Sequence, residues 1–383
     1  MRENLPTIAI IDPLGKHGGF HYYVSGTARG LAAQGHPVHV YVTAFTGITP
    51  GKPFAERVAF GDLYGPTPTA VRAARYFVGL IRALWWSRWA GAEIVILHAF
   101  QHDLREMTAI WGARLLGLKV ILTVHDIESF GSPRSALTRR LAMAGASALV
   151  FQNRFSKAAF ERLRAGPTQR SAIIPHGHYV DDYPSPPSRE EARRQLGLDA
   201  DEFIFLFFGN PREEKGLDLL IRALAALRDR PGWRLVTAGK MKPHQEADIR
   251  GLVEKTGLGN RVRIDARHIA DDEAATYYRA ANIVVVPYRR IYESGVTIMA
   301  MSLERAALVS DLEPLTNKIV HHRTGLVFAS GDETSLAAAL HEALGCRGEL
   351  DDFGREGRLS VLAANDWMQI GAALSALGRA LCR

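Results

Sequence analysis

Two cations stand close together after an apolar run in the second half of the chain. Residues 203–216 read FIFLFFGNPREEKG, so the run ends at a glycine and Arg212 and Lys215 follow, directly before an expected helix. A helix N-terminus attracts anions through its free amides and its dipole, and basic side chains add to that attraction. The segment therefore predicts a diphosphate site. The alternative is a charged surface in which Glu213 and Glu214 pair with the cations.

A second helix start is expected after another strand, at residues 283–287. Ser294 and Gly295 open a pattern that should stay helical as far as Ser302, and a loop rich in Tyr and Arg precedes it. Serine is a favoured N-cap residue, and the helix start is therefore a second place for an anion. The alternative for the loop side chains is a solvated surface.

Polar residues also follow strands expected in the first half of the chain. His98 ends one strand, His125 and Asp126 follow another, and His17 lies in the first loop beside the pair Gly18–Gly19. The glycine pair allows backbone amides to approach a phosphate or a sugar, although the dinucleotide fingerprint GxGxxG is absent. The alternatives are a plain strand-to-helix turn and histidines satisfied by backbone hydrogen bonds. No carboxylate or cysteine stands at metal-ligand spacing, so no metal site is expected.

The elements that must position these residues alternate between apolar runs and helical patterns, which is typical of an α/β fold with parallel sheets. We expect strands at residues 7–11, 38–43, 94–98, 120–124, 148–152, 171–174, 203–208, 234–238, 262–264, 283–287, 307–310 and 326–328. A first domain should cover residues 1–180, a linker 181–198 and a second domain 199–364. An apolar helix is expected at about 365–383, and it should pack against one of the two domains, the first or the second. Both domains should be doubly wound and Rossmann-like, with a ligand cleft between them.

The composition agrees with a two-domain globular protein. Of 383 residues, 47% are hydrophobic and 23% charged, which excludes wholesale disorder. The net charge of +7 favours anionic partners. The 2 cysteines cannot build a disulfide framework or a four-ligand zinc site, and neither a signal peptide nor a membrane span is recognised. We therefore expect a cytoplasmic protein.

Several motifs occur in the order of a known family. They are Gly18–Gly19, Gly35–Val38, Thr123–Asp126, Ile174–Gly177, Arg212–Gly216, Tyr277–Ala281, Ser310–Asp311 and Thr324–Phe328. Together they resemble the nucleotide-sugar glycosyltransferases of the GT-B fold, family 4-like, from Ile8 to about Leu340. The resemblance implies two Rossmann-like domains, of which the first binds the acceptor and the second the nucleotide.

The sequence departs from this family on the donor side. Asn210 fills the position of the usual arginine, and Ile291 and Met299 replace a pair of glutamates. Glu304 stands where glycine is usual. The loop from Tyr288 to Val296 instead resembles a subgroup that lacks the paired glutamates.

The resemblance implies a metal-independent hexosyltransferase that moves a sugar from a UDP- or GDP-linked donor to a carbohydrate acceptor. The acceptor would be lipid-linked, in bacterial polysaccharide or glycoconjugate synthesis, and neither cofactor nor nucleic acid is expected. Residues expected to be catalytic are His125, Asp126, Arg212 and Lys215, and the acceptor side holds His17 and His98. Residues expected to contact the donor are Gly18, Gly19, Asn210, Arg212, Lys215, His268, Tyr288, Tyr292, Glu293, Ser294, Gly295 and Val296.

Two other functions remain open, a catalytically weak scaffold or partner subunit and a nucleotide-sugar epimerase. The missing glutamate pair motivates the first. The stereochemistry is open as well, because inversion needs a general base, for which Asp126 and His17 are candidates, whereas retention does not. The donor sugar, the base, the acceptor and the oligomeric state are not determined.

One stretch suggests contact with a membrane. Residues 71–89 combine four arginines with five aromatic residues in a helical pattern that contains no acidic residue. Interfacial helices combine Trp and Phe with basic residues in this way, so we expect an anionic membrane surface as a partner. The lipid-linked acceptor that the resemblance implies would place this surface at the inner leaflet. The alternative is a core helix whose arginines extend to water.

Overall fold

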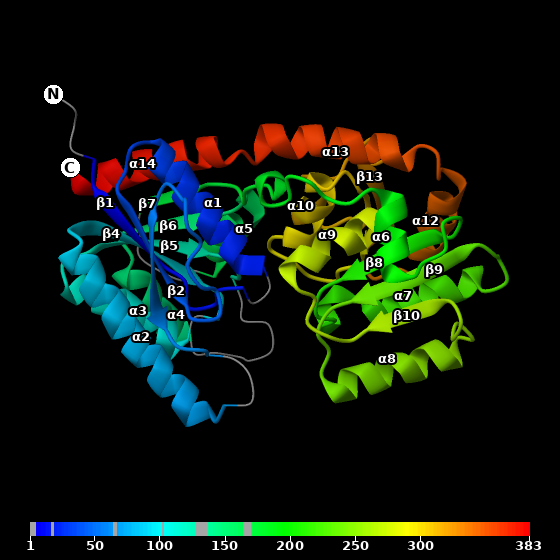
Figure 1. Ribbon diagram of the computed structural model, residues 1–383, viewed down its shortest axis with the longest axis horizontal. Helices are drawn as coiled ribbons and strands as arrows, with labels where there is room; N and C mark the ends of the chain where they lie inside the picture. The colour runs from blue at the N-terminus through cyan, green and yellow to red at the C-terminus, as the bar shows by residue number, and fades with distance from the viewer. Residues whose placement is uncertain (1–4, 17–18, 64–66, 102, 128–135, 164–169) are drawn as a thin grey trace. The chain divides into compact units, whose positions relative to one another are not determined.

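The computed structural model describes residues 5–16, 19–63, 67–101, 103–127, 136–163 and 170–383 (Figure 1). The chain divides into two compact units. The first comprises Met1–Gly177 together with Asn365–Arg383, and the second comprises His178–Ala364.

The first unit is built on a seven-stranded parallel sheet with the order β3-β2-β1-β4-β5-β6-β7. Its strands are β1 (Thr7–Ile11), β2 (Val38–Thr43), β3 (Ala55–Phe60), β4 (Ala92–Ala99), β5 (Lys119–Val124), β6 (Ala148–Phe151) and β7 (Arg170–Ile173). The connecting helices are α1 (Phe20–Ala33), α2 (Thr69–Trp89), α3 (Leu104–Leu115), α4 (Ala136–Gly145) and α5 (Arg154–Arg162). The inner strands β1, β4, β5 and β6 are buried almost throughout, as a sheet covered on both faces requires.

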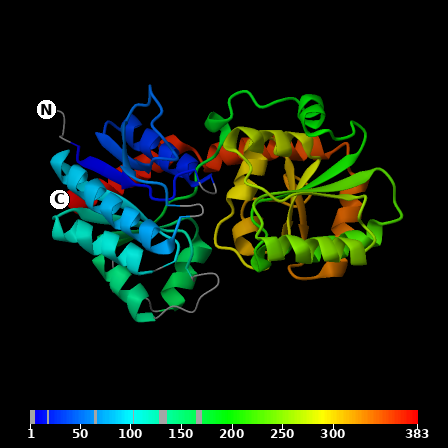
Figure 2. The ribbon, with the colours of Figure 1, turned by 60° about the horizontal axis from the view of Figure 1, so that its bottom comes forward.

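The C-terminal helix α14 (Trp367–Cys382) belongs to the first unit and packs against α1. Figure 2 shows these two helices on one side of the sheet and α2 and α3 on the other. The two backbones approach closely where Gly30 faces Gly371, because a Cβ on Gly371 would lie 2.2 Å from the Gly30 carbonyl oxygen. Trp367 is buried in the same core as the β1 and β2 side chains. The structure thus places this helix with the first of the two domains on which it was expected to pack.

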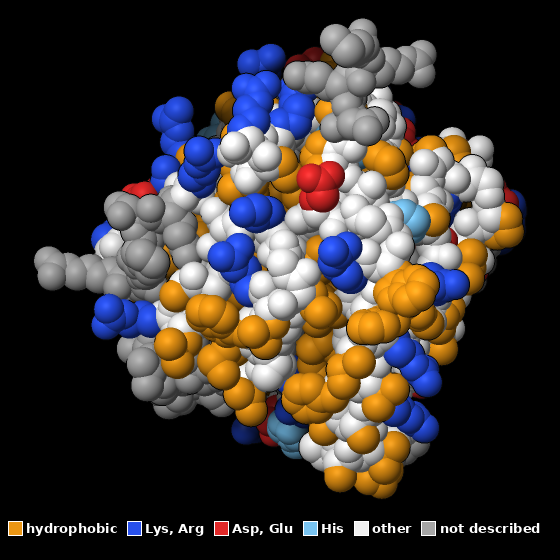
Figure 3. Space-filling model, turned by 90° about the vertical axis from the view of Figure 1, so that its left-hand side faces the viewer, with side chains coloured by type: hydrophobic (Ala, Val, Ile, Leu, Met, Phe, Trp, Pro, Cys, Tyr) orange, Lys and Arg blue, Asp and Glu red, His pale blue; other side chains and the backbone are white. Residues whose placement is uncertain are grey.

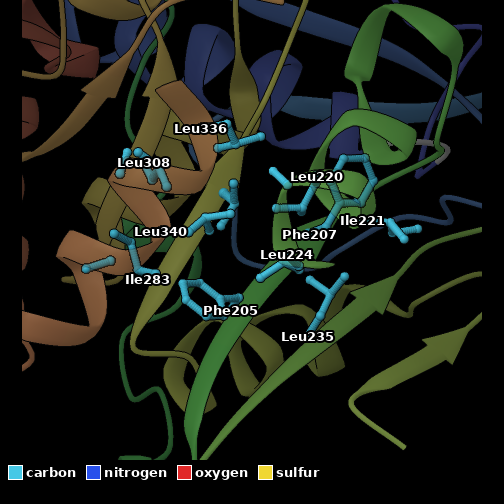
Figure 4. Close-up of a cluster of buried hydrophobic side chains, with 14 of the residues drawn as sticks. Phe205, Phe207, Leu220, Ile221, Leu224, Leu235, Ile283, Leu308, Leu336 and Leu340 are labelled. Carbon is cyan, nitrogen blue, oxygen red and sulfur yellow. The ribbon is translucent and has the colours of Figure 1, made fainter. Parts of the chain in front are cut away.

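The second unit has a six-stranded parallel sheet with the order β10-β9-β8-β11-β12-β13. Its strands are β8 (Phe203–Phe208), β9 (Trp233–Ala238), β10 (Val262–Asp265), β11 (Ile283–Val286), β12 (Ala306–Ser310) and β13 (Gly325–Phe328). Its helices are α6 (Arg189–Leu196), α7 (Leu217–Leu224), α8 (Pro243–Lys255), α9 (Asp271–Ala280), α10 (Gly295–Ser302), α11 (Glu313–Thr316), α12 (Glu333–Gly345) and α13 (Leu350–Ala364). In the core, phenylalanines of β8 pack against leucines of α7 and α12 (Figure 4). Both units are therefore Rossmann-like α/β domains.

Three local features differ from the sequence-based expectations. Part of the expected linker 181–198 is the helix α6, which Ser188 caps and which the buried Arg193 anchors through the Ala280 carbonyl and the Asn282 side chain. The strand β3 was not expected, because four of its six residues are not buried and the apolar run is missing. Glu304 adopts a left-handed φ of 56°, which explains why glycine suits this position in the family.

Candidate functional site

The site in the second unit is centred on Lys215, which ends a short 3-10 turn, Glu213–Lys215, between β8 and α7. Its Nζ lies 5.6 Å from the centre of the Tyr288 ring. Gly209, at the end of β8, makes room for it, because a Cβ on Gly209 would lie 2.8 Å from Nζ and the residue has a φ of +103°. The absence of a side chain at Gly209 therefore leaves room for this ammonium group beside the Tyr288 ring.

The Lys215 ammonium group forms no ion pair with any residue that the structure describes. The neighbouring Glu214 lies 3.9 Å from Arg290 instead, so the alternative of a Lys215 paired with its own loop is wrong. Burial, and then the positive charge of Arg212, lower the pKa of Lys215 from 10.5 to about 8. A largely buried, unpaired cation directly before a helix start is suited to bind an anion.

A salt bridge ties the first turn of α7 to the loop after β11. The Arg289 guanidinium donates to both carboxylate oxygens of Asp218, over 2.8 and 2.7 Å, and to the Glu213 carbonyl oxygen over 2.8 Å. Hydrogen bonds from Arg289 and Arg222 lower the pKa of Asp218 to about 2. Sequence reasoning counted Arg289 only as a loop cation, because its partner lies 71 residues away. We assign Arg289 to positioning these elements, whereas no residue in the described part of the chain supplies a carboxylate partner for Lys215.

The helix α10 begins where the sequence predicted. The buried Ser294 is its N-cap and accepts a hydrogen bond from the Thr297 amide over 3.2 Å. The Glu293 carboxylate lies 2.8 Å from the Lys318 ammonium group and accepts from the Ser294 amide. Glu293 thus orients the start of α10, and its contact with a donor stays a prediction.

Tyr288, from the loop after β11, joins this helix start to the region around Lys215. Its side chain is buried, and its carbonyl oxygen accepts from the hydroxyl of Ser310 over 2.6 Å. Burial raises the pKa of the Tyr288 phenol, so the phenol is neutral.

The remaining residues expected on the donor side take different positions. Tyr292 is buried, Gly295 and Val296 lie in the first turn of α10, and Asn210 and Arg212 are exposed in the loop after β8. His268 is exposed in the loop after β10, at the carboxyl edge of the sheet. The place of His268 in a base pocket stays a prediction.

In the first unit the structure brings His98 and His125 together at the carboxyl edge of the sheet. His98 Nδ1 lies 3.1 Å from His125 Nε2, and Phe100 stacks on the His125 ring at 4.4 Å. Sequence reasoning missed Gln152, whose side-chain amide lies 3.2 Å from His125 Nδ1. Its position directly after β6 was a signal that could have found it.

The other residues predicted to be functional in the first unit lie next to these histidines in the sequence or fall on the first loop. Asp126 follows His125 and is half-buried. Gly19 is the N-cap of α1, with a φ of 74°. His17 and Gly18 lie outside the described residues.

One group of potential metal ligands occurs in the described part of the chain. Ligand atoms of His321, His322 and Glu342 lie within 4.8 Å of one another at the amino end of β13, the opposite edge from Lys215. However, His321 Nδ1 accepts a hydrogen bond from the Val327 amide over 3.1 Å, which leaves the proton of a neutral ring on Nε2. The ring then offers no free lone pair, and we assign no metal to this group.

Two family models match the chain, one in each unit. Residues 188–360 match the model of the glycosyl transferases group 1, and residues 18–177 match the model of a glycosyl transferase 4-like domain. Together these matches cover most of the chain.

Individual relatives are about a quarter identical to this chain over the aligned residues. A D-inositol 3-phosphate glycosyltransferase 1 of Catenulispora acidiphila is 27% identical over 305 residues, 72% of this chain and 70% of that protein. A lipopolysaccharide core biosynthesis mannosyltransferase, LpsB, of Rhizobium meliloti is 27% identical over 175 residues, 44% of this chain and 49% of that protein. The second match thus spans about half of that relative.

Solved structures share the fold over nearly the whole chain. Sucrose-phosphate synthase from Thermosynechococcus elongatus has a TM-score of 0.78 at 23% identity, covering 98% of this chain and 99% of that one. Anabaena HepE in complex with UDP-glucose has a TM-score of 0.75 at 16% identity, covering 98% and 99%. At these identities the likeness shows the fold alone.

Proposed function

Because the chain belongs to the family 4-like glycosyltransferases of the GT-B fold, we propose that it transfers a hexose from a UDP- or GDP-linked donor to a carbohydrate acceptor. The observation that carries this proposal is the Lys215 ammonium group before α7, with which no described residue forms an ion pair. The HepE complex, which contains UDP-glucose in the same fold, supports a nucleotide-sugar donor.

In the proposed reaction, the bond between the anomeric carbon and the phosphate oxygen breaks. The acceptor hydroxyl oxygen bonds to that carbon and loses its proton, and the nucleoside diphosphate leaves. Negative charge grows on the leaving diphosphate, so Lys215 stabilises the transition state more than the ground state. The start of α10, which Ser294 caps, supplies amides for the same charge. With this positive charge provided by the chain itself, we propose that transfer needs no metal ion, which undiminished activity in EDTA would test.

The first unit is the proposed acceptor side, with His98, His125 and Asp126 at its sheet edge. Asp126 is the general-base candidate if the transfer inverts the anomeric configuration. In that case Asp126→Asn should lose most activity and keep its affinity for the nucleotide. Undiminished turnover in this variant would exclude the inverting mechanism with Asp126 as base.

A calorimetric screen of UDP, GDP and their glucose and mannose derivatives tests the donor assignment. We expect one nucleotide series to bind and its sugar form to hydrolyse slowly without acceptor. Absence of binding by every nucleotide would overturn the proposal and favour a scaffold. A changed sugar still attached to its nucleotide would instead identify an epimerase.

We further propose that the acceptor is lipid-linked and that α2 lies on an anionic membrane surface. Its outer side exposes large apolar residues, among them Ile81 at 67%, Trp85 at 54% and Trp89 at 76%, and Leu115 at 87% extends from α3. The helix carries arginines and no acidic residue. On the face shown in Figure 3, hydrophobic side chains gather with Lys and Arg side chains around them. No helix of the described residues has the length and apolar character that crossing a bilayer requires.

Sedimentation with vesicles that contain phosphatidylglycerol tests this surface. Binding should weaken with added salt and in the double variant Ile81→Ser/Trp89→Ser, because both the basic and the apolar contributions fall. Leu359→Ser, which changes a residue 62% exposed on α13, is the matched control and should bind normally. Equal recovery in the supernatant with and without vesicles would make the acceptor soluble.

A further inference from the structure

Three polar side chains stand in a row on three neighbouring strands of the first unit. His98 lies near the end of β4, His125 directly follows β5, and Gln152 directly follows β6. The sheet itself sets their spacing, because Val124 pairs with Phe151 in register and the His125 amide donates to the Ala99 carbonyl over 2.9 Å. The pairing of the strands therefore fixes the backbone positions of these three residues relative to one another.

The hydrogen bonds along this row have a single direction. The Gln152 amide nitrogen can only donate, so His125 Nδ1, at 3.2 Å, must accept. A neutral His125 then carries its proton on Nε2 and donates it to His98 Nδ1 over 3.1 Å. His98 in turn carries its proton on Nε2, and this atom is buried without a hydrogen-bond partner among the described residues.

Aromatic rings keep both histidines neutral. Phe100 stacks on His125 with an interplanar angle of 5°, and Phe20 meets the rings of His98 and His125 edge-on at 4.8 and 5.4 Å. Burial lowers the pKa of His98 to about 3 and that of His125 well below its usual value. Protonation of His125 would also place a hydrogen on Nδ1 against the amide of Gln152, so geometry and burial favour the same neutral state.

We propose that Gln152 is a positioning residue that fixes the proton of His98 on Nε2, and that this N–H donates to a hydroxyl oxygen of a bound sugar. A buried donor without a partner is unfavourable, and a ligand oxygen relieves that state. A neutral donor in an aromatic surrounding is suited to an uncharged oxygen and not to a phosphate. That the ligand is a sugar rests on the proposed function, whereas the direction of the hydrogen bonds does not.

Nitrogen-15 NMR of the histidine rings in the full chain tests the direction without any activity. Wild-type His98 and His125, assigned through His→Gln variants, should both show a proton on Nε2. Gln152→Glu places a carboxylate, which can only accept, opposite His125 Nδ1, so both protons should move to Nδ1. His36 is the internal control, because its Nδ1 faces the Pro6 carbonyl oxygen at 2.8 Å and should stay protonated in every variant. Protons on Nδ1 in the wild type, or unchanged His98 signals in Gln152→Glu, would overturn the proposal.

A second measurement identifies the sugar that His98 contacts. In His98→Ala we expect about a tenfold loss, the range of one hydrogen bond. If the partner is the acceptor, its KM rises and the affinity for the nucleotide-sugar is unchanged. If the partner is the donor sugar, affinity for the nucleotide-sugar falls while that for the free nucleotide stays. Unchanged values for both substrates would overturn the contact, even where the tautomer result holds.

Discussion

Lys215→Met removes a partly buried cation for which no described residue supplies a carboxylate partner. The folded state lowers the pKa of Lys215 from 10.5 to about 8, which at about 1.4 kcal/mol per pH unit corresponds to at most about 3.5 kcal/mol. Because the side chain keeps some contact with water, this value is an upper bound. Below pH 8 the lysine is charged in both states and the full penalty applies. We therefore expect the variant to be more stable than the wild type at pH 7.

The pH dependence follows from the same shift. Between pH 8 and 10.5 the folded protein has released this proton and the unfolded chain still holds it, so the wild type gains stability as the pH rises. The advantage of Lys215→Met in the free energy of unfolding should therefore shrink across this window. Urea titrations of both proteins at pH 7 and 9.5 measure this difference in the free energy of unfolding.

The same variant should bind the nucleoside diphosphate more weakly than the wild type does. A hydrogen bond to a charged group contributes about 1.5–3 kcal/mol, so the Kd for the bound nucleoside diphosphate should rise roughly tenfold to a hundredfold. Turnover should fall at least about a hundredfold, as when one donor to a developing anion is removed. In the wild type, affinity should decline above pH 8 as Lys215 loses its proton.

Stability and binding thus change in opposite directions, which separates a binding residue from a structural one. Lys255→Met, at the exposed end of α8, is the control and should leave affinity unchanged. A variant Lys215→Met that is less stable than the wild type at pH 7, or that binds the nucleotide normally, would refute the reasoning.

Three further substitutions test individual packing and capping arguments. Asp12→Asn should raise the free energy of unfolding by up to about 3 kcal/mol at pH 8 and by much less at pH 4.5. Burial raises the pKa of Asp12 from 3.8 to about 6, so the wild type loses stability as the pH rises through that window. Equal gains at both pH values would contradict this. Ser294→Ala should lower the free energy of unfolding by about 1 kcal/mol through loss of the N-cap, measured by urea titration, and an unchanged midpoint would remove the cap assignment. Gly371→Ala should lower it by about 1–3 kcal/mol, because the new methyl group meets the Gly30 backbone, whereas Gly348→Ala, with open space around it, should have little effect.

The sequence predicted most of the fold because its signals are local. Most inner strands are nearly continuous apolar runs, and the start of α10 is marked by Ser294, a side chain that caps the helix it precedes. The edge strand β3 was missed for the same reason, since Glu56 and Arg57 interrupt its apolar pattern. The helix α6 was hidden by the prolines before it, although Ser188 and the acidic residues of its first turn were recognisable signals.

The candidate site was less accessible from sequence, because the significance of a charge depends on its partner. Lys215 and Arg289 both look like loop cations, but Asp218 neutralises Arg289 across 71 residues and nothing described neutralises Lys215. The pairing between these loops depends on β8 and β11 being neighbours in the sheet, which no local pattern states. The same holds for Gln152, whose effect on His125 exists only because β5 and β6 pair in register. Residue types therefore point to the chemistry, and the strand order decides which side chains remain available to perform it.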